Sequence, residues 1–557
     1  MHQPDTTPRR SLYFNYEVFQ AAPLPPEPDA LAPVLIVGAG PVGLALALDL
    51  ARHGVRVVVV TAGQQVSEGS RAIVFTRRSL EILQQVGADS ALVEHGLPWR
   101  FGSSFYRGQE VFRLEAPHDL HDRFAPLNNL QQQVLEASML TRIAREPLIE
   151  LRWGHLVTAV TCDDEAAVVT IDTPHGVYTQ RAAWVVACDG ARSSLRQLQG
   201  LHLEGESWQG RFVIADIKID LPLPTERLAF FDPTWNPGNT VLMHREPFGI
   251  WRIDYQLPPD ETPEQALQPA SLASRINAQL QSIGFGDKPW ALDWCSVYSA
   301  RALSLANYLE QRVIYCGDAA HLLPIFGVRG ANTGLQDAQN LGWKLAAHVQ
   351  GKAPVELLHS YSAERVAAAR EIVAEAGKST RFMTPPTPGF RLLRDATLSL
   401  ALTEHFVRPL MHWRTSRPHE YLHSPLNTAV DDAAQCLTGP APGAVMPSVR
   451  LAEDRYLLDD ADTGFTLLLF SDLPVPPAVQ AAADQWRAQG GALRIVLLPR
   501  TTAEGAAWQR YGVVSDGAAY LVRPDQHVCA RWLQLEPTRL LHALSRALGR
   551  ASPEKTP

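Results

Sequence analysis

Residues 34–50, VLIVGAGPVGLALALDL, decide the fold of this 557-residue chain. The apolar run 34–37 predicts a buried strand, and the apolar pattern after Pro41 predicts a helix. Between them, Gly38, Gly40 and Gly43 form a GxGxxG motif. The first glycine permits a tight turn, the second lets backbone amides approach a pyrophosphate, and the third lets the helix pack closely. The stretch therefore predicts a nucleotide-binding unit, with these glycines and Pro41 at the phosphates.

The second predicted strand, 55–60, departs from the usual pattern at its end. An acidic residue about 20 residues after the glycine motif normally binds a ribose hydroxyl. Here Val60 is followed by Thr61. A threonine hydroxyl makes a weaker contact than a carboxylate, and Thr61 is the candidate for this position. No second strand-GxGxxG-helix unit occurs in the sequence, so a second permanently bound nucleotide is not expected.

Two further apolar runs, 184–188 and 313–316, predict buried parallel strands that end in glycine turns. DGAR (189–192) follows the first run, and GD (317–318) follows the second. A carboxylate at the end of such a strand can hold a sugar-alcohol hydroxyl. Further on, GANT (330–333) opens an amphipathic helix, whose N-terminal amides can face an electron-rich ring edge.

The composition excludes several classes of protein. Hydrophobic residues make up 46% of the chain, and 58 acidic against 50 basic residues give a net charge of −8. This excludes disorder, and without a basic block no nucleic acid partner is expected. The most apolar run, 34–50, contains glycines and a proline, so no membrane span is expected. The six cysteines form no CxxC pair and no metal-ligand spacing, which predicts no metal site and a reducing, cytoplasmic location.

Beyond the nucleotide-binding unit, the pattern of the chain changes twice. Alternating segments at 211–220, 227–232 and 251–257 predict an antiparallel sheet inserted into the first domain. Helical patterns follow from 360 to about 423, interrupted by prolines near 383–389. GPAPGAVMP (439–447) then predicts a linker to a small domain. The strands predicted in that domain are 465–470, 493–498 and 519–523.

The three glycine motifs, in this order, resemble the single-component FAD-dependent aromatic hydroxylases, which include p-hydroxybenzoate hydroxylase and phenol hydroxylase. Within this group, the chain resembles the branch of 3-(3-hydroxyphenyl)propionate hydroxylase and pentachlorophenol monooxygenase. Further matching pieces are GSRA (69–72), NLQQQVLE (129–136) and RGANTGLQD (329–337). The resemblance covers about 34–365, and LVRPD (521–525) resembles the end of the thioredoxin-like domain that some of these enzymes carry.

The resemblance implies a role for each matching residue. Gly38, Gly40 and Gly43 would bind the FAD pyrophosphate, and Arg71 and Gln132 would contact the ribityl-phosphate region. Asp318 would hold a ribityl hydroxyl, while Asp189 and Arg192 would contact FAD and help NAD(P)H binding. The amides of Gly330, Ala331, Asn332 and Thr333 would face the flavin N1/O2 edge. The carbonyl of Pro324 would face the substrate.

The fold class implied is α/β: a Rossmann-like FAD-binding domain of the p-hydroxybenzoate hydroxylase type, an inserted antiparallel-sheet substrate domain and a C-terminal thioredoxin-like domain. The division expected is an N-terminal arm (1–33), the FAD-binding domain in two parts (34–204 and 298–380), the substrate domain (205–297), a helical connector (381–430) and the thioredoxin-like domain without CxxC (431–557). A homodimer is the candidate assembly.

The implied reaction is hydroxylation of a phenolic or other electron-rich ring through a C4a-hydroperoxyflavin, with NADPH or NADH and O2 as co-substrates. The protein must then activate the phenol, and a base needs hydrogen-bond reach to the phenol oxygen. His244, Arg252 and Tyr255 on the inserted sheet are the candidates. Tyr255 alternates with apolar neighbours and also fits a core position, and His244 also fits a polar turn. His321 is expected to position the Asp318 turn by a hydrogen bond.

Other functions fit the same motifs. One is Baeyer-Villiger or tailoring oxygenation of a polyketide-like or drug-like aromatic. Another is a flavin-binding protein without turnover, for which Thr61 would be a first sign of decay. A flavin halogenase fits less well, because the sequence has no WxWxIP motif and Trp251 begins WRIDYQ instead.

Overall fold

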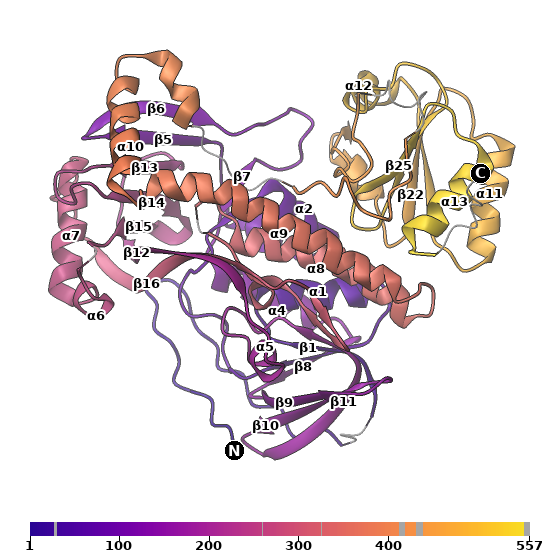
Figure 1. Ribbon diagram of the computed structural model, residues 1–557, viewed down its shortest axis with the longest axis horizontal. Coiled ribbons are helices and arrows are strands. Elements are labelled where there is room, and N and C mark those ends of the chain that lie inside the picture. The colour runs from indigo at the N-terminus through magenta and orange to yellow at the C-terminus, as the bar shows by residue number, and fades with distance from the viewer. Residues whose placement is uncertain (27–29, 259, 325, 412–417, 431–437, 551–557) are drawn as a thin grey trace.

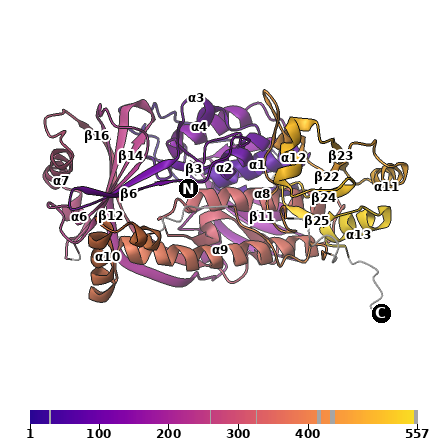
Figure 2. The ribbon, with the colours of Figure 1, turned by 90° about the horizontal axis from the view of Figure 1, so that it is seen from above.

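The computed structural model describes residues 1–557 except 27–29, 259, 325, 412–417, 431–437 and 551–557 (Figure 1). Two large sheets lie next to each other, and a third, smaller sheet belongs to a separate C-terminal domain. Seen from above, the long helices α8 (Gly330–Val349) and α9 (Glu356–Met383) run between the second sheet and the C-terminal domain (Figure 2). Among the described helices, none has the length and apolar character needed to cross a membrane.

The first sheet has the order β17-β18-β11-β1-β2-β8, and its central strands are parallel. Their apolar side chains form the largest core of the molecule, together with α1 (Pro41–Arg52) and α8. The four buried parallel strands predicted from the sequence are confirmed. The strands are β1 (Ala32–Val37), β2 (Val57–Thr61), β8 (Ile149–Trp153), β11 (Gly176–Ala187), β17 (Leu309–Glu310) and β18 (Val313–Tyr315), with β9 (Leu156–Cys162) and β10 (Ala167–Thr173) extending β11.

Shorter elements surround this sheet. A small three-stranded sheet has the order β3-β7-β4. Its strands are β3 (Val74–Thr76), β4 (Leu97–Trp99) and β7 (Leu127–Asn129). The helices of this region are α2 (Arg77–Gln85), α3 (Ser90–Glu94), α4 (Gln132–Ile143) and α5 (Ser194–Leu198).

The second sheet has the order β19-β16-β12-β15-β14-β13-β5-β6. The predicted alternating segments all form strands in it, and their pairing is antiparallel as expected. The strands are β5 (Phe101–Tyr106), β6 (Gln109–Glu115), β12 (Glu204–Lys218), β13 (Arg227–Phe231), β14 (Thr240–Glu246), β15 (Ile250–Gln256), β16 (Ala291–Ser304) and β19 (His321–Leu322).

Three strands of this sheet, β5, β6 and β19, come from parts of the chain that the sequence-based division placed in the FAD-binding domain. β5 pairs in parallel with β13, and β6 then pairs with β5. The sheet is therefore mixed at this edge. A parallel pairing between strands more than a hundred residues apart leaves no local sequence signal, so the pattern of 101–115 does not reveal its partner.

The two faces of the second sheet have different neighbours. One face carries Val213, Trp251 and Ile253 and packs against α7 (Pro269–Ser282), which follows the short helix α6 (Pro263–Ala266). Side chains in a strand alternate between faces. Phe212, Asp216, Arg252 and their neighbours therefore lie on the opposite face, which is turned toward the first domain. We call this the inner face.

α9 ends at Met383, and α10 (Pro388–Ala401) begins after a short break. This agrees with the interruption predicted near 383–389. A 3-10 turn, His405–Met411, follows. The remaining part of the predicted helical connector includes 412–417, which lie outside the described residues.

The C-terminal domain contains the sheet β23-β22-β24-β25, with β22 parallel to β23 and antiparallel to β24. The three predicted strands are confirmed, and β25 is an additional one. This β-α-β and β-β-α arrangement is consistent with a thioredoxin-like fold. Cys529 is buried, and Cys436 lies outside the described residues. The elements are β20 (Arg450–Ala452), β21 (Arg455–Tyr456), β22 (Phe465–Phe470), β23 (Leu493–Leu498), β24 (Ala518–Val522), β25 (Val528–Trp532), α11 (Pro477–Ala488), α12 (Ala506–Arg510) and α13 (Pro537–Ala547).

A buried ionic cluster joins this domain to α8 and α9. Arg523 donates to both carboxylate oxygens of Glu364, at 2.7 and 3.1 Å, and also pairs with Asp525. Lys344 lies 2.7 Å from Glu364 Oε2. All four side chains are almost fully buried. The LVRPD segment singled out in the sequence is therefore a docking contact between domains.

The N-terminal arm packs along the first domain instead of extending from it. Its start lies near the end of β2, where His2 Nε2 is 2.8 Å from the carbonyl oxygen of Ala62. The arm then reaches the second sheet, where Ser11 Oγ donates to Asp293 at 2.8 Å. It returns to the first sheet, where the ring of Phe19 stacks on Trp153. The arm thus links the two large sheets.

Candidate functional site

The GxGxxG turn has the geometry that close phosphate approach requires. Gly38 has φ +112°, and its N–H donates to the carbonyl oxygen of Val60 at 2.8 Å. A Cβ at Gly38 would overlap the backbone of Cys188, and a Cβ at Gly43 would overlap the carbonyl oxygen of Gly38. At Gly40, by contrast, a Cβ would meet no atom within 4 Å. The first and third glycines serve packing, and the second faces open space.

This open space lies at the N-terminus of α1. Gly40 is the N-cap residue and Pro41 follows in the first turn. No side chain caps the helix, and its first turn carries no acidic residue. The free N–H groups and the positive end of the helix dipole favour an anion here. Thr61, at the end of β2, is partly exposed and lies one strand away.

A buried hydrogen-bond network fixes the Gly317-Asp318 turn. The N–H of Gly317 donates to Asp337 Oδ2 at 3.1 Å, and His321 Nε2 lies 2.6 Å from the same oxygen. Arg365 donates to the other oxygen of Asp337. These contacts agree with the expectation that His321 positions the turn. Burial alone would raise the pKa of Asp337, but Arg365 and His321 outweigh it and lower that pKa below its ordinary value.

Asp318 itself is exposed to solvent, yet protein atoms around it raise its pKa by desolvation. This combination is typical of a carboxyl group in a recess. The positive charges of Arg71 and Arg196 act on it from nearby and lower its pKa in part. The structure therefore brings together Arg71 and Asp318, which are far apart in the sequence.

The DGAR segment lies beside this turn. Asp189 Oδ2 accepts hydrogen bonds from Ser194 Oγ and from the N–H of Leu195. Arg192 is exposed. Arg196, to which sequence reasoning gave no role, donates to the carbonyl oxygens of Ala319 and Ala191. Arg196 thus connects the DGAR segment to the turn at Gly317-Asp318.

The N-terminus of α8 presents backbone groups. Asn332 is buried, and its side chain is engaged by Thr76, Ser79, Val74 and Val328. It therefore anchors the helix start. A Cβ at Gly330 would meet no atom within 4 Å, and the first turn has no acidic residue and no side-chain cap. The amides of 330–333, rather than their side chains, are the groups available to a ligand.

The segment Gly69-Ser70-Arg71 connects the recess to the second sheet. Gln132 Oε1 accepts from the N–H of Ala72, and its amide group donates to Ser67 and Glu136. Gln132 thus holds the segment from inside the first domain. From the other side, Arg252 donates to the carbonyl oxygen of Ser70, and Ser70 Oγ donates to Asp216.

The three candidates on the second sheet differ in placement. Arg252 lies on the inner face and is bound to Asp216 through Nε (2.8 Å) and Nη2 (2.9 Å). His244 lies on the same face; burial, with Arg227 and Arg252 nearby, lowers its pKa to about 3. Tyr255 lies on the opposite face, next to Trp235 and within the core under α7. Its placement corresponds to the core position and not to a site residue.

Sequence reasoning missed Asp254, which also lies on the inner face. It is buried, and its Oδ1 has no hydrogen-bond partner among the described residues. Burial raises its pKa to about 7, although Arg252 opposes the shift. An aspartate within an apolar strand pattern gives no warning of such a position, and only the register of the sheet reveals it.

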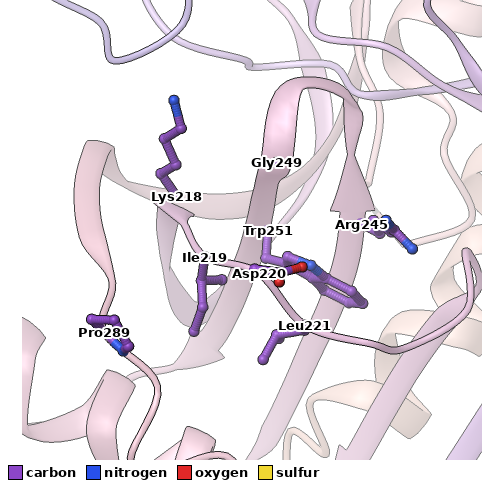
Figure 3. Close-up of a pocket in the computed structure, with 8 residues that line it drawn as sticks. All are labelled: Lys218, Ile219, Asp220, Leu221, Arg245, Gly249, Trp251 and Pro289. Atoms are coloured by element: carbon purple, nitrogen blue, oxygen red, sulfur yellow. The ribbon is translucent and has the colours of Figure 1, made fainter.

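An open pocket lies elsewhere, at the end of the second sheet (Figure 3). It has a volume of about 290 Å³ and includes Lys218, Asp220, Arg245 and Trp251 in its lining. None of its lining residues belongs to the glycine motifs. The lining also lacks the three candidates His244, Arg252 and Tyr255.

Comparison with known proteins identifies the family of the chain. The FAD binding domain family matches residues 31–376, and the aromatic-ring hydroxylase C-terminal family matches residues 439–551. The chain belongs to the FAD-binding aromatic-ring hydroxylases. It is an FAD-dependent aromatic monooxygenase, with NAD(P)H and O2 as co-substrates. The resemblance drawn from the three glycine motifs is thereby confirmed.

Individual relatives agree with this hydroxylase family. The 3-(3-hydroxy-phenyl)propionate/3-hydroxycinnamic acid hydroxylase of Mycolicibacterium smegmatis is 29% identical over 82% of this chain and 80% of its own length. The enzyme of the same name from Mycolicibacterium gilvum is 30% identical, with 82% and 79% covered. Aklavinone-11 hydroxylase, solved with FAD and aklavinone, is 25% identical, with a TM-score of 0.76 over 94% of this chain and 99% of that one. The flavin-dependent monooxygenase PieE has the same fold, with a TM-score of 0.80 over 94% and 100% at 23% identity.

The residues of the recess fit FAD. The open space at Gly40 and the uncapped start of α1 suit a pyrophosphate. The recessed carboxyl of Asp318 suits a ribityl hydroxyl, because a hydrogen-bond donor there would relieve its desolvation. The second open glycine position, Gly330, leaves space at the start of α8 for a ring edge.

Proposed function

We propose that this hydroxylase acts on a small phenol that carries a side chain, like the compounds that name its curated relatives. The observation that supports this is the inner face of the second sheet. Apolar side chains, Phe212 and Leu242 among them, surround a few buried polar groups there. Binding sites for small aromatic molecules have this composition.

We propose the following positions for FAD. The amides after Gly38 and Gly40 hold the pyrophosphate, with Gly43 allowing the helix to approach. Thr61 faces the ribose. Arg71 and Asp318 contact the ribityl-phosphate region, and Gln132 acts indirectly by holding the segment that carries Arg71. The amides of 330–333 supply positive potential to the flavin ring edge, since they lie at an uncapped helix N-terminus.

When bound, FAD supplies hydride acceptance from NAD(P)H and the activation of O2. The chain must position the phenol, exclude water and accept its proton. We propose that the Pro324 segment closes the site next to the sheet, since the neighbouring Phe326 packs edge-to-face on Phe212. Asp189 and the exposed Arg192 are proposed to assist NAD(P)H binding. Arg252 is proposed to position the site through Asp216 and Ser70.

A substrate panel tests this proposal. The enzyme is loaded with FAD, and NADH or NADPH oxidation is followed with 3-(3-hydroxyphenyl)propionate, 3-hydroxycinnamate and simple phenols. We expect one of these phenols to accelerate NAD(P)H oxidation and to yield a ring-hydroxylated product. If the flavin stays oxidised with every phenol and both nucleotides, the chain is a flavin-binding protein without turnover.

A larger aromatic is the second candidate substrate. The match to aklavinone-11 hydroxylase covers more of this chain than the matches to the curated relatives. The panel therefore includes a polycyclic phenol, and the product is examined for a ring-expanded ester, which would indicate Baeyer-Villiger oxygenation.

Further expectations concern the cell and the assembly. We propose a cytoplasmic enzyme without a nucleic acid partner, in keeping with its net charge of −8. All five cysteines in the described part of the chain are free, which suits a reducing compartment. The homodimer stays a prediction, and light scattering of the purified enzyme checks it.

A further inference from the structure

The register of the second sheet places Asp254 between two contacts with the first domain. On β12, Asp216 is bonded to Ser70, next to the proposed ribityl-phosphate residue Arg71. On the same strand, Phe212 packs on Phe326, two residues after Pro324 in the sequence. Ile214 lies midway between Phe212 and Asp216, and its partner across the sheet is Asp254.

Asp254 is therefore at the middle of the inner face. Its other cross-strand partner is Leu242 of β14. Both partners are apolar and buried, so they offer the carboxyl group no hydrogen bond. A buried carboxylate without a donor is costly, and proteins retain such groups mainly at functional sites.

The charged and titratable groups around Asp254 come from four strands. Arg252 favours its ionised form, while Asp216 disfavours it. Glu246 and His244 lie on β14, and the charge of Asp254 helps to raise the pKa of Glu246. Burial raises the pKa of Tyr298 on β16, and the charge of Asp254 raises it further. Arg252 donates its hydrogen bonds to Asp216. The charge of Arg252 therefore stabilises an ionised Asp254, while the carboxylate of Asp254 stays available to the substrate.

We propose that Asp254 is the base that accepts the proton of the substrate phenol. The assignment rests on the proposed hydroxylation of a phenol. In the step, the phenol O–H bond breaks, the proton passes to a carboxyl oxygen of Asp254, and the electron pair stays on the phenol oxygen. The ring becomes more electron-rich without any change of oxidation state. Asp254 afterwards returns the proton to the product or to solvent.

The pKa of about 7 suits this role near neutral pH, since efficient bases titrate close to the working pH. His244 suits it less, because its ring is already neutral far below pH 7 and its Nδ1 is buried without a partner among the described residues. Tyr298, with a pKa raised well above its ordinary value by burial, stays protonated.

The test compares Asp254→Asn with His244→Asn in FAD-loaded enzyme, using 3-(3-hydroxyphenyl)propionate and the best phenol of the panel. We expect kcat/KM of the wild type to fall below about pH 7. Asp254→Asn should lose this acid limb and about 10²-fold in hydroxylation, with flavin content unchanged. His244→Asn should keep the limb.

A second measurement does not depend on turnover. 4-Nitrophenol, whose anion absorbs visible light, is added to oxidised holoenzyme. We expect the wild type to bind it as the anion at a pH where the free phenol is partly neutral, and Asp254→Asn to bind it as the neutral form. Asp254→Asn should also fold at least as stably as the wild type, because it removes an unpaired buried charge; Asp216→Asn, which breaks bonds to Arg252 and Ser70, should be less stable.

The outcomes separate the two proposals. If the wild type hydroxylates a phenol and Asp254→Asn keeps the acid limb, the rate and the anionic nitrophenol spectrum, Asp254 is not the base. If the limb disappears in His244→Asn instead, His244 takes that role. If the wild type oxygenates no phenol, the proposed function fails and the base assignment is rejected with it.

Discussion

The phenol oxygen of Tyr16 lies 3.0 Å from the backbone nitrogen of Gly69, whose N–H donates a buried hydrogen bond to it. Gly69 has φ +66°, and a Cβ there would overlap the ring of Trp294. The turn that precedes Arg71 is thus enclosed by the N-terminal arm on one side and by the second sheet on the other. The arm therefore supports the segment that carries Arg71.

Tyr16→Phe is predicted to weaken FAD retention. Loss of the phenol leaves the N–H of Gly69 without its partner, at a cost of about 1–3 kcal/mol, and loosens the turn before Arg71. The rate of flavin release on dilution, followed by the rise of flavin fluorescence, measures the effect. Tyr520→Phe is the matched control, because it also removes a hydroxyl that is hydrogen-bonded to buried backbone, in this case as the donor to the carbonyl oxygen of Tyr511 in the C-terminal domain. Equal flavin release in both variants would contradict a role of the arm.

Gly40→Ala is predicted to impair FAD binding, whereas Gly43→Ala is predicted to impair folding. At Gly40 the backbone has φ −78°, which alanine adopts, and the added methyl group enters open space. This variant should fold normally and lose FAD, since the methyl group occupies the place of the pyrophosphate. At Gly43 the methyl group would collide with the carbonyl oxygen of Gly38.

The second variant should therefore be unstable even without cofactor. Thermal unfolding of the apoproteins and flavin titration separate the two effects. Normal FAD affinity of Gly40→Ala would show that the pyrophosphate does not lie at this turn.

Asp318→Asn is predicted to reduce FAD affinity about 10-fold to 100-fold. A charged carboxylate contributes on the order of 1.5–3 kcal/mol to a hydrogen bond with a sugar hydroxyl, and the amide contributes less. The apoprotein should be at least as stable as the wild type, because Asp318 is desolvated. Isothermal titration of the apoprotein with FAD checks both affinity and stoichiometry. An unchanged affinity would remove Asp318 from the site.

Glu364→Gln is predicted to destabilise the contact of the C-terminal domain. It leaves Arg523 and Lys344 buried with less countercharge, and breaking a buried ion pair costs about 3–5 kcal/mol. Burial opposes the ionised form of Glu364, but Arg523 and Lys344 outweigh it and lower its pKa. This contribution to stability is therefore present above the ordinary pKa of a glutamate and is lost as the pH falls through the lowered pKa.

Urea unfolding at pH 7 and at pH 3.5 measures this contribution. The difference between wild type and Glu364→Gln should be large at pH 7 and should shrink toward acid pH. A difference that does not depend on pH would mean that Glu364 acts by packing alone.

The sequence predicted the first sheet because buried parallel strands are continuous apolar runs, as at 34–37 and 313–316. It also predicted the glycine turns at Gly38 and Gly317, where the backbone has positive φ. It could not assign β5 to the second sheet, because that pairing is long-range. Nor could alternation decide which face of β15 points inward, so Tyr255 was a candidate and Asp254 was missed. The arm lacks regular elements, and its contacts follow only from the folded chain.

The most direct test of the account is the fate of oxygen from labelled O2. FAD-loaded enzyme is supplied with NAD(P)H, ¹⁸O2 and the phenol that best accelerates NAD(P)H oxidation, and the product is analysed by mass spectrometry. We expect one ¹⁸O atom on the ring of the product, with NAD(P)H consumption matching product formation. A product without label, or NAD(P)H consumption that ends in hydrogen peroxide with every phenol, would contradict it.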